Sequence, residues 1–254
     1  MPDTPVSDAE RLRLRERPPG RALMRQVWRH LGFLHWPVAP AAIAPLLPPG
    51  LQVDTFDGAA YVGIVPFTIP LTRSALGGLP MAPGFHELNL RTYVHRDGRD
   101  PGVWFFSLDA ASRLAVAGAR IAYGLPYFHA RMTMAVAGGE GAATIDYRSQ
   151  RASGGATFAG RYRPTGAVAT AAPGTLEFFL AERYLLYAWT GRALRKARVS
   201  HAAYPLQPAT ADAVAQTVTD AARLPPDAFA APPPLVHYAC EVDVAIFGPR
   251  RPSP

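Results

Sequence analysis

Apolar and polar residues alternate over short stretches of this chain, and that pattern predicts β-strands. Turn dipeptides such as Asp57-Gly58 and Asp97-Gly98 separate several of the stretches. Many short strands with frequent turns indicate a mainly β (α+β) fold, an antiparallel sheet closed or folded on itself with a few peripheral helices. The expected strands are 28–36, 59–67, 85–94, 103–108, 127–134, 144–148, 156–163, 195–204 and 236–247.

One stretch, residues 101–134, predicts a strand, a helix, a tight stop and a second strand. Asp109 or Ser112 can cap the helix, and Gly124 with Pro126 ends it. Its apolar positions follow the 3.6-residue helical period, which is typical of a helix with one apolar face. These positions are Leu114, Ala117, Ile121 and Leu125.

Four other segments complete the expected organisation of the chain. A short helix that starts at a proline is expected over 41–47, and an amphipathic helix or lid over 176–189. The glycine- and proline-rich segment 73–84 predicts a loop at a rim or lid. Residues 1–20 are expected to be a flexible arm with a helical turn or two around 9–16, before a single domain over 21–248 and a tail over 249–254.

The strand 85–94 places unusual polar side chains on one side. Successive residues of a strand point to opposite faces, so a carboxylate, an amide and a guanidinium follow one another on that side. An exposed face with surface ion pairs would produce the same pattern. Large aromatic residues at both ends of the series favour the lining of a cavity instead. The same-side residues are Phe85, Glu87, Asn89, Arg91 and Tyr93.

The strand 127–134 also has one polar face, carrying Tyr127, His129, Arg131 and Thr133. Its other face is apolar, so the polar side chains point either to water or to a ligand. His129 and His35 are also typical of structural histidines held by hydrogen bonds. The triplet 182–184, Glu-Arg-Tyr, indicates a salt-bridged packing element.

The chain of 254 residues is 49% hydrophobic, enough for one large core. Its net charge of +7 is concentrated at the ends: residues 1–29 hold seven basic and four acidic side chains, and two arginines stand at 250 and 251. Residues 30–249 therefore carry a net charge of only +2. Lys196 is the single lysine among 26 basic residues, which indicates compositional bias more than selection for phosphate binding. We expect no nucleic-acid partner.

Cys240 is the only cysteine, so a disulfide within the chain is excluded, and the N-terminal residues contain no apolar leader-like run. A cytoplasmic location is the simplest expectation. Residues 31–53 have no formal charge apart from His35, but five prolines make a membrane span implausible. Glycine-rich nucleotide motifs, a nucleophile elbow and metal-ligand spacing are all missing, so no cofactor and no metal are expected.

Several short motifs, taken in order, resemble the YqjF-like uncharacterised family, a domain of unknown function in the acetoacetate decarboxylase-like superfamily. Each motif alone is weak, but as an ordered set they are specific and cover most of residues 27–247. The matching pieces are His35-Trp36-Pro37, Leu46-Leu47-Pro48 to Leu51, Asp57-Gly58 to Pro66-Phe67, Glu87-x-Asn89-x-Arg91-Thr92-Tyr93, Phe106-Ser107-Leu108-Asp109, Leu125-Pro126-Tyr127 and Glu182-Arg183-Tyr184.

The resemblance implies a cone-shaped closed β-barrel with a central ligand cavity. Acetoacetate decarboxylases form a Schiff base through a lysine that follows the proline after the helix, and a neighbouring lysine lowers its pKa. In this sequence Tyr127 and Phe128 stand there. A family carboxylate falls at Gly63 and is also missing, whereas Glu87 matches another cavity glutamate. The resemblance therefore implies the scaffold without the Schiff-base chemistry.

We therefore expect a small anionic or carbonyl-bearing organic molecule, such as a carboxylate, to bind in the cavity. Arg91 and Arg131 would hold a carboxylate, Glu87 with Asn89 would orient a polar group, and Tyr127 would fill the place of the lost lysine. Tyr93 and His35 complete the expected binding set.

Three alternatives for the activity stay open at this point. The protein is a lyase, hydratase or isomerase that uses Glu87 or His129 as general acid or base, a non-catalytic sensor or accessory protein, or a structural protein with a filled interior. Assembly into a homo-oligomer is compatible with each of these.

Overall fold

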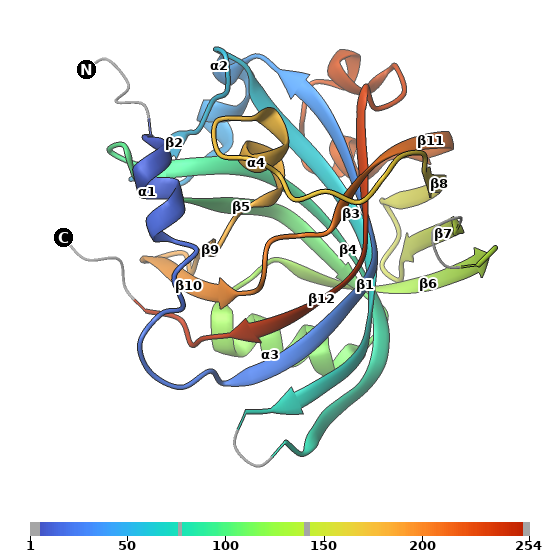
Figure 1. Ribbon diagram of the computed structural model, residues 1–254, viewed down its shortest axis with the longest axis horizontal. Helices are drawn as coiled ribbons and strands as arrows, with labels where there is room; N and C mark the ends of the chain where they lie inside the picture. The colour runs from blue at the N-terminus through green and yellow to red at the C-terminus, as the bar shows by residue number, and fades with distance from the viewer. Residues whose placement is uncertain (1–5, 76–77, 140–142, 251–254) are drawn as a thin grey trace.

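The computed structural model describes residues 6–75, 78–139 and 143–250, and strands make up most of it. All twelve strands belong to one sheet (Figure 1). They are β1 (Met24–Val38), β2 (Gln52–Val53), β3 (Ala60–Ser74), β4 (Pro80–Arg96), β5 (Arg99–Ala110), β6 (Tyr127–Ala137), β7 (Thr144–Arg151), β8 (Thr157–Pro164), β9 (Leu185–Trp189), β10 (Leu194–Ser200), β11 (Leu206–Gln216) and β12 (Leu235–Ile246).

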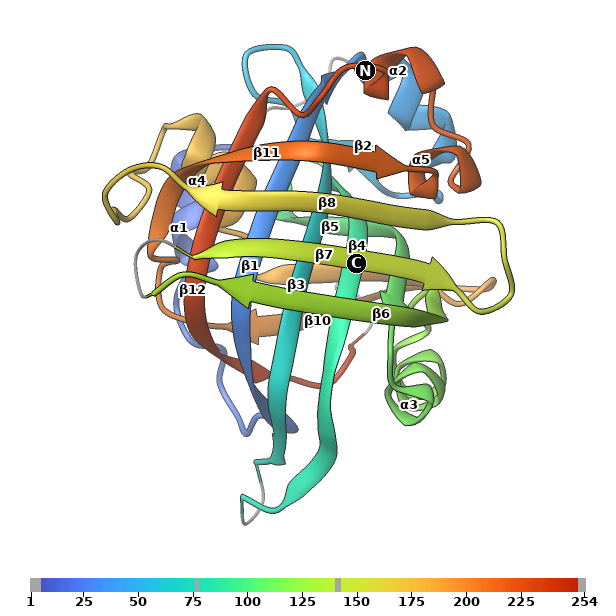
Figure 2. The same ribbon diagram turned by 90° about the vertical axis from the view of Figure 1, so that its right-hand side faces the viewer.

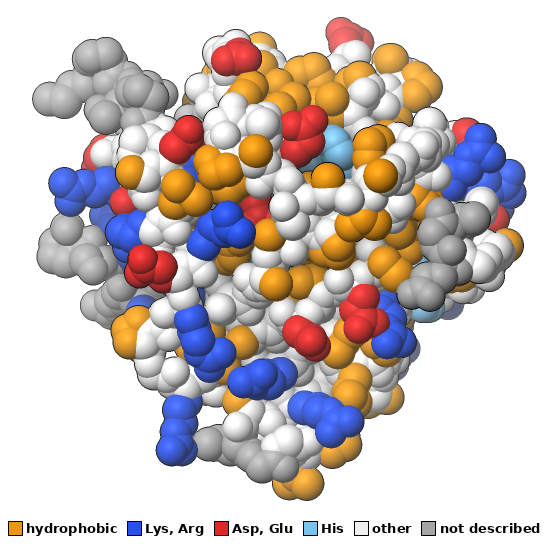
Figure 3. Space-filling model, viewed as in Figure 1, with side chains coloured by type: hydrophobic (Ala, Val, Ile, Leu, Met, Phe, Trp, Pro, Cys, Tyr) orange, Lys and Arg blue, Asp and Glu red, His pale blue; other side chains and the backbone are white. Residues whose placement is uncertain are grey.

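Short helices lie at the periphery of this sheet (Figures 1 and 2). They are α1 (Asp8–Arg13), α2 (Pro40–Ile43), α3 (Arg113–Tyr123), α4 (Leu176–Ala181) and α5 (Val218–Ala221), with 3-10 turns η1 (Ala44–Leu46) and η2 (Pro226–Phe229). In the described part of the chain, none of the helices has the length and apolar character that crossing a bilayer requires. Acidic and basic side chains are interspersed over the face shown in Figure 3.

The sheet runs in the order β10-β9-β5-β6-β7-β8-β11-β12-β1-β3-β4-β2, and it closes on itself through further pairings of β10 with β12 and of β5 with β4. In Figure 2 the strands β6, β7, β8 and β11 cross in front of β12, β1, β3 and β4. The mainly β fold with few helices is therefore confirmed.

Two pairings depart from the antiparallel expectation, because β5 runs parallel to β6 and to β9. Parallel neighbours need a long crossover, and α3 provides it between β5 and β6.

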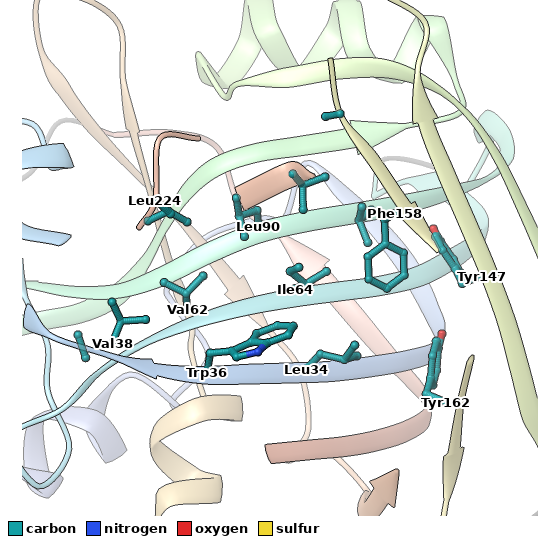
Figure 4. Packing of buried hydrophobic residues seen from close by; sticks show 14 of the residues in the cluster. Leu34, Trp36, Val38, Val62, Ile64, Leu90, Tyr147, Phe158, Tyr162 and Leu224 are labelled. Atoms are coloured by element: carbon teal, nitrogen blue, oxygen red, sulfur yellow. The ribbon is translucent and has the colours of Figure 1, made fainter. Parts of the chain in front are cut away.

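The largest apolar cluster lies between β1, β3 and β4 on one side and β7 and β8 on the other. Leu34, Ile64 and Leu90 belong to it from the first group of strands, and Tyr147 and Phe158 belong to it from the second (Figure 4). All five are at most 1% exposed, so this face of the three strands is densely packed.

The loop expected over 73–84 is much shorter in the structure. Strand β3 continues to Ser74 and β4 already starts at Pro80, so the two form a long hairpin; residues 76 and 77 lie outside the described ones. Residues 80–85 of β4 pair with β3 alone, and a proline is tolerated where one edge of a strand has no partner.

The helix expected over 176–189 is also shorter. Helix α4 ends at Ala181, and after three irregular residues Leu185–Trp189 form β9, which pairs with β5 and β10. The backbone groups of 185–189 therefore find partners in the sheet, which outweighs their helical pattern.

Helix α3 lies where it is expected, but its apolar face is reversed. Ser112 caps it, and Gly124 ends it with a φ of +68°. Of the four positions expected to form the apolar face, Leu114 and Ile121 are 75% and 87% exposed and Ala117 is also exposed, while Leu125, just after the helix, is buried. Within the helix Val116 and Tyr123 are the buried residues. The tertiary packing, not the helical period of the largest residues, selects the buried face.

Candidate functional site

The second face of β1, β3 and β4 carries the polar side chains that the sequence singled out. His35, Gly63 and Arg91 lie opposite one another on the three strands, so they share this face. A Cβ atom on Gly63 would come within 2.8 Å of the His35 ring. Gly63 is therefore the position that makes room for His35 beside Arg91.

Arg91 is a buried cation, and only 8% of the residue is exposed. Its Nη2 donates to the carbonyl oxygen of Leu180 at 3.1 Å and to the Tyr93 hydroxyl at 3.3 Å, while its Nε has no hydrogen-bond partner. Among the described residues no carboxylate forms an ion pair with it. A buried charge without a counter-ion is unfavourable, so this place favours an anion.

The Tyr93 hydroxyl determines the tautomer of His35. It donates to the carbonyl of Leu180 at 2.7 Å, so it accepts the hydrogen bond from His35 Nε2, 2.6 Å away. Nδ1 is then the unprotonated nitrogen, and it is buried without a partner. Burial, with a smaller effect from Arg91, lowers the pKa of His35 well below its ordinary value, so the ring is neutral at pH 7.

Glu87 stands four residues before Arg91 on β4 and is 5% exposed. The Tyr127 hydroxyl donates to its Oε2 at 2.9 Å. Burial raises the pKa of Glu87 to about 8, with the Tyr127 hydrogen bond lowering it and Asp109 raising it further. The carboxyl group is therefore mostly protonated at pH 7 and does not balance the charge of Arg91.

Asn89 lies between these two groups. It is opposite Leu108 on β5, which in turn lies opposite Tyr127 on β6, so Asn89 and Tyr127 share a face. Its Oδ1 is buried without a partner. Along the strand, Glu87 and Arg91 are about 13 Å apart, and Asn89 is halfway. We call His35, Glu87, Asn89, Arg91, Tyr93 and Tyr127 the interior polar cluster.

The two remaining candidates on β6, His129 and Arg131, differ in their exposure to solvent. His129 is half-buried and lies opposite Ala110, itself opposite Glu87, so it is on the same face at the edge of the cluster. Arg131 is exposed, and by that point β6 pairs with β7 and no longer with β5. Arg131 is therefore exposed where Arg91 is buried, and a shared role of the two in anion binding stays a prediction.

A neighbouring ionic cluster was not anticipated from the sequence. Asp54, 2% exposed, accepts hydrogen bonds from Arg11 at 2.7 and 2.8 Å and from Arg183 at 2.6 Å. Burial opposes ionisation of Asp54, but Arg183 and Arg11 outweigh burial and lower its pKa. The guanidinium carbon of Arg183 lies 4.8 Å from the centre of the Tyr93 ring, which joins this cluster to the interior one.

Two of its members come from segments that the sequence analysis had already interpreted, Arg11 as part of a flexible arm and Arg183 as part of a packing element. Arg11 belongs to the expected flexible arm, yet α1 is held against the domain by this buried ion pair. Arg183 belongs to the 182–184 triplet, and its contact with Asp54 agrees with the expected packing role. Asp54 follows β2 directly, and nothing in its local pattern indicated burial.

Lys196 is placed away from the interior polar cluster. Its Nζ forms an ion pair with Asp100 at 2.5 Å, and both side chains line a surface hollow of about 690 Å³. The other lining residues are Glu10, Arg13, Arg96, Asp97 and Arg99. Within the ranges that the structure describes, no three His, Cys, Asp or Glu side chains are grouped closely enough to hold a metal ion.

Comparison with known proteins identifies relatives along almost the whole chain. A family model of uncharacterised conserved proteins, DUF2071, matches residues 25–243. The uncharacterised protein YqjF of Bacillus subtilis is 41% identical over 239 residues, which cover 92% of this chain and 94% of YqjF.

Solved structures with the same fold have little sequence identity to this chain. An acetoacetate decarboxylase-like enzyme from Sphingomonas wittichii superposes with a TM-score of 0.63 at 15% identity, covering 92% of this chain and 94% of the other. Acetoacetate decarboxylase from Legionella pneumophila has a TM-score of 0.63 at 13% identity, and the match covers 93% of this chain and 88% of the decarboxylase. The enduracididine biosynthesis enzyme MppR, complexed with pyruvate, has a TM-score of 0.61 at 15% identity, with 93% of each chain covered.

Proposed function

The chain belongs to the DUF2071 family of uncharacterised conserved proteins and has an acetoacetate decarboxylase-like fold, and from this premise we propose that it binds a small organic carboxylate at the interior polar cluster. The carboxylate would contact Arg91, and the other end of the molecule would extend along β4 towards Asn89 and Glu87. The observation that carries this proposal is the buried guanidinium of Arg91 without a carboxylate partner among the described residues.

The electrostatic balance of the cluster supports an anionic ligand. His35 is neutral because its pKa is lowered, and Glu87 is mostly protonated because its pKa is raised to about 8. Arg91 is therefore the one charged member of the cluster at pH 7. An incoming carboxylate would supply the missing counter-charge and accept from the free Nε in a charge-assisted hydrogen bond.

Unused hydrogen-bonding atoms support a ligand with further oxygen atoms. His35 Nδ1 accepts nothing, and Asn89 Oδ1 accepts nothing, although both are buried. A hydroxyl or a hydrated carbonyl group on the ligand would donate to either atom. MppR, which shares the fold, is complexed with pyruvate, and this agrees with a 2-oxo or 2-hydroxy acid as the class to test first.

The residues disfavour a decarboxylase of the Schiff-base type. Tyr127 and Phe128 occupy the positions after the Pro126 turn, and the one lysine of the chain is bound to Asp100 at a surface hollow. Nucleophilic catalysis by an amine needs an uncharged amine at the ligand. Lys196 instead forms an ion pair with Asp100 and lines the surface hollow, not the interior polar cluster.

A catalytic version of the proposal is favoured by one observation, the pair of Glu87 and Tyr127. A carboxyl group with a pKa of about 8 is suited to give or take a proton near neutral pH. If Glu87 transfers a proton in this way, the protein would be a lyase, hydratase or isomerase acting on the bound carboxylate. Without turnover it would be a ligand sensor or accessory protein.

Thermal denaturation with and without pyruvate, lactate, acetoacetate and succinate tests the binding proposal. A ligand at about 100 times its dissociation constant adds ~2.7 kcal/mol to the free energy of unfolding. Arg91→Met should abolish the stabilisation, while Arg148→Met, which removes an exposed arginine of β7, should keep it. Equal loss in both variants, or stabilisation by none of the acids, would contradict carboxylate binding at Arg91.

NMR spectra of a stabilising acid, recorded during long incubation with the protein, separate enzyme from sensor. Exchange of its carbon-bound hydrogens with deuterium or formation of a product that disappears in Glu87→Gln identifies the enzyme. An unchanged spectrum identifies the sensor. Borohydride added with acetoacetate should leave the mass of the protein unchanged, and an adduct at Lys196 would overturn the absence of Schiff-base chemistry.

A further inference from the structure

A surface hollow of about 510 Å³ lies outside the interior polar cluster, where the end of α3 meets the β9–β10 hairpin. We call it the α3–β9 hollow. Its volume is within the range of sites that bind small molecules. The lining residues are Arg120, Ile121, Ala122, Tyr123, Gly124, Leu125, Trp189, Thr190 and Arg195.

Gly124 explains how the two segments come together at the hollow. It ends α3 with a φ of +68°, a conformation that favours glycine. A Cβ atom at this position would lie 3.0 Å from Cγ2 of Thr190 at the start of the hairpin turn. The helix end and the hairpin therefore meet closely, and the side chains beside this contact surround the hollow.

Two arginines give the hollow a positive charge. Arg120 uses its Nε to donate to the carbonyl oxygen of Tyr127 at 2.7 Å, while the Nε of Arg195 is buried and has no hydrogen-bond partner. Neither guanidinium forms an ion pair with a carboxylate in residues 6–75, 78–139 and 143–250. Two such cations on one hollow attract an anion.

A third polar residue belongs to the lining of the hollow. Tyr123 is 8% exposed, and its hydroxyl group is buried without a hydrogen-bond partner. Burial also raises the pKa of Tyr123, so the hydroxyl remains a donor at pH 7. An unsatisfied donor on a residue that lines the hollow suits a ligand oxygen better than it suits an apolar protein wall.

The rest of the lining is apolar. Ile121 is 87% exposed, although it is a large aliphatic residue, and Leu125 and Trp189 line the hollow with it. Cationic groups next to apolar walls match a molecule that has a carboxylate at one end and a hydrocarbon body at the other.

We propose that the α3–β9 hollow is a second ligand site, which binds an organic carboxylate with an apolar body. Arg195, Arg120 and the Tyr123 hydroxyl hold the carboxylate, and Ile121, Leu125 and Trp189 contact the body. This site is separate from the interior polar cluster, since none of the six residues of that cluster lines the hollow. The proposal is therefore independent of the function proposed for Arg91.

Four probe molecules test separately whether the carboxylate and the apolar body each contribute to binding at the α3–β9 hollow. Octanoate and benzoate carry both a carboxylate and an apolar body, acetate carries the carboxylate alone, and octanol carries the body alone. Titration of the full chain, followed by calorimetry and tryptophan fluorescence, should show saturable binding of octanoate or benzoate at least about tenfold tighter than that of acetate or octanol. Trp189→Phe should remove the fluorescence change because the ligand contacts this indole.

Matched arginine variants locate the binding. Arg195→Ala should weaken the better probe at least about tenfold, since it loses a charge-assisted hydrogen bond. Arg192→Ala, which removes an exposed arginine of the same hairpin, should change affinity less than about twofold. Arg195→Gln, which keeps a polar side chain, is the second variant if the alanine variant does not fold.

Three results would overturn the proposal. One is the absence of saturable binding of octanoate and benzoate up to about 10 mM, well above the dissociation constants of specific sites. Another is an equal effect of Arg195→Ala and Arg192→Ala. The third is loss of binding in Arg91→Met but not in Arg195→Ala, which would move these probes to the interior polar cluster.

Discussion

The two faces of the sheet formed by β1, β3 and β4 differ, although they alternate along the same strands. On one face Leu34, Ile64 and Leu90 belong to an apolar cluster with aromatic rings, and the Tyr147 hydroxyl in that cluster has hydrogen-bond acceptors (Figure 4). On the other face His35 and Arg91 are buried to nearly the same degree, and each keeps an unpartnered nitrogen.

This difference indicates that one face of the three strands stabilises the fold and that the other is suited to bind a ligand. The apolar face contributes hydrophobic burial and dense packing, which stabilise the fold. The polar face buries groups whose hydrogen bonds are incomplete, and such burial costs free energy. A region that a protein keeps at a cost to its stability is a candidate for ligand binding, and the variants below test that interpretation.

The largest expected change in stability is that of Leu90→Ala on the apolar face, compared with the variant of its neighbour Asn89 on the polar face. Leu90→Ala should lower the free energy of unfolding by about 3–5 kcal/mol, because it leaves a cavity in a packed cluster. Asn89→Ala should lower it by less than about 1 kcal/mol, because Oδ1 loses no partner. Urea denaturation measures both values. Equal losses would show that the polar face is as tightly packed as the apolar one.

The next effect concerns the pH dependence of stability. The pKa of Glu87 is raised in the folded protein from its ordinary 4.5 to about 8, so its favourable contribution is complete below pH 4.5 and is lost as the pH rises through 8. Between pH 5 and 9, wild-type protein should lose roughly 2–4 kcal/mol more stability than Glu87→Gln.

The comparison with Glu87→Gln cancels groups that titrate in both proteins, His35 included. Parallel stability curves for the two proteins would mean that Glu87 is ionised throughout this range. A buried ion pair with Arg91 would then be the better description of the interior polar cluster.

A smaller effect tests the contact between His35 and Gly63. Gly63→Ala should cost about 1–3 kcal/mol, because its Cβ would lie 2.8 Å from the His35 ring. His35→Ala in the same protein removes that ring, so the double variant should be less destabilised than the sum of the single ones. Additive losses would indicate that the two positions do not touch.

The smallest effect is expected for Arg91→Met in the absence of ligand. Replacing a buried unpaired cation by an apolar side chain of similar length should leave stability unchanged or raise it by about 1 kcal/mol. Calorimetric unfolding of the free protein measures it. A loss above about 2 kcal/mol would mean that the contacts of Arg91 with Leu180 and Tyr93 stabilise the fold, and that its role is structural.

Much of the fold was predictable, because β-strand alternation is a local property. The strands around 28–36, 85–94 and 103–108 were placed correctly, although each is longer in the structure. Strand β11 was missed, since its many alanines produce only weak alternation. The hairpin over 73–84 was missed because glycine and proline usually interrupt strands, and pairing along one edge tolerates them here.

The candidate site was predictable in part for the same reason. Alternation put Glu87, Asn89 and Arg91 on one face, and the structure confirms their burial. The exposure of Arg131 could not be predicted, because β6 stops pairing with β5 after His129, which no local pattern reveals. Arg11 and Asp54 are 43 residues apart in the chain, and only the closed sheet brings them together.

The sequence by itself determined which residues alternate, where helices are capped and which chemical groups are present, the missing Schiff-base lysine among them. These properties depend on neighbours within a few residues. The tertiary structure alone decided which face is buried, whether a charge finds a partner and which pKa shifts, as α3 and Arg91 illustrate. Burial and electrostatics depend on atoms that distant segments bring into contact, and for that reason the reversed face of α3 and the unpaired guanidinium of Arg91 emerge only in the folded chain.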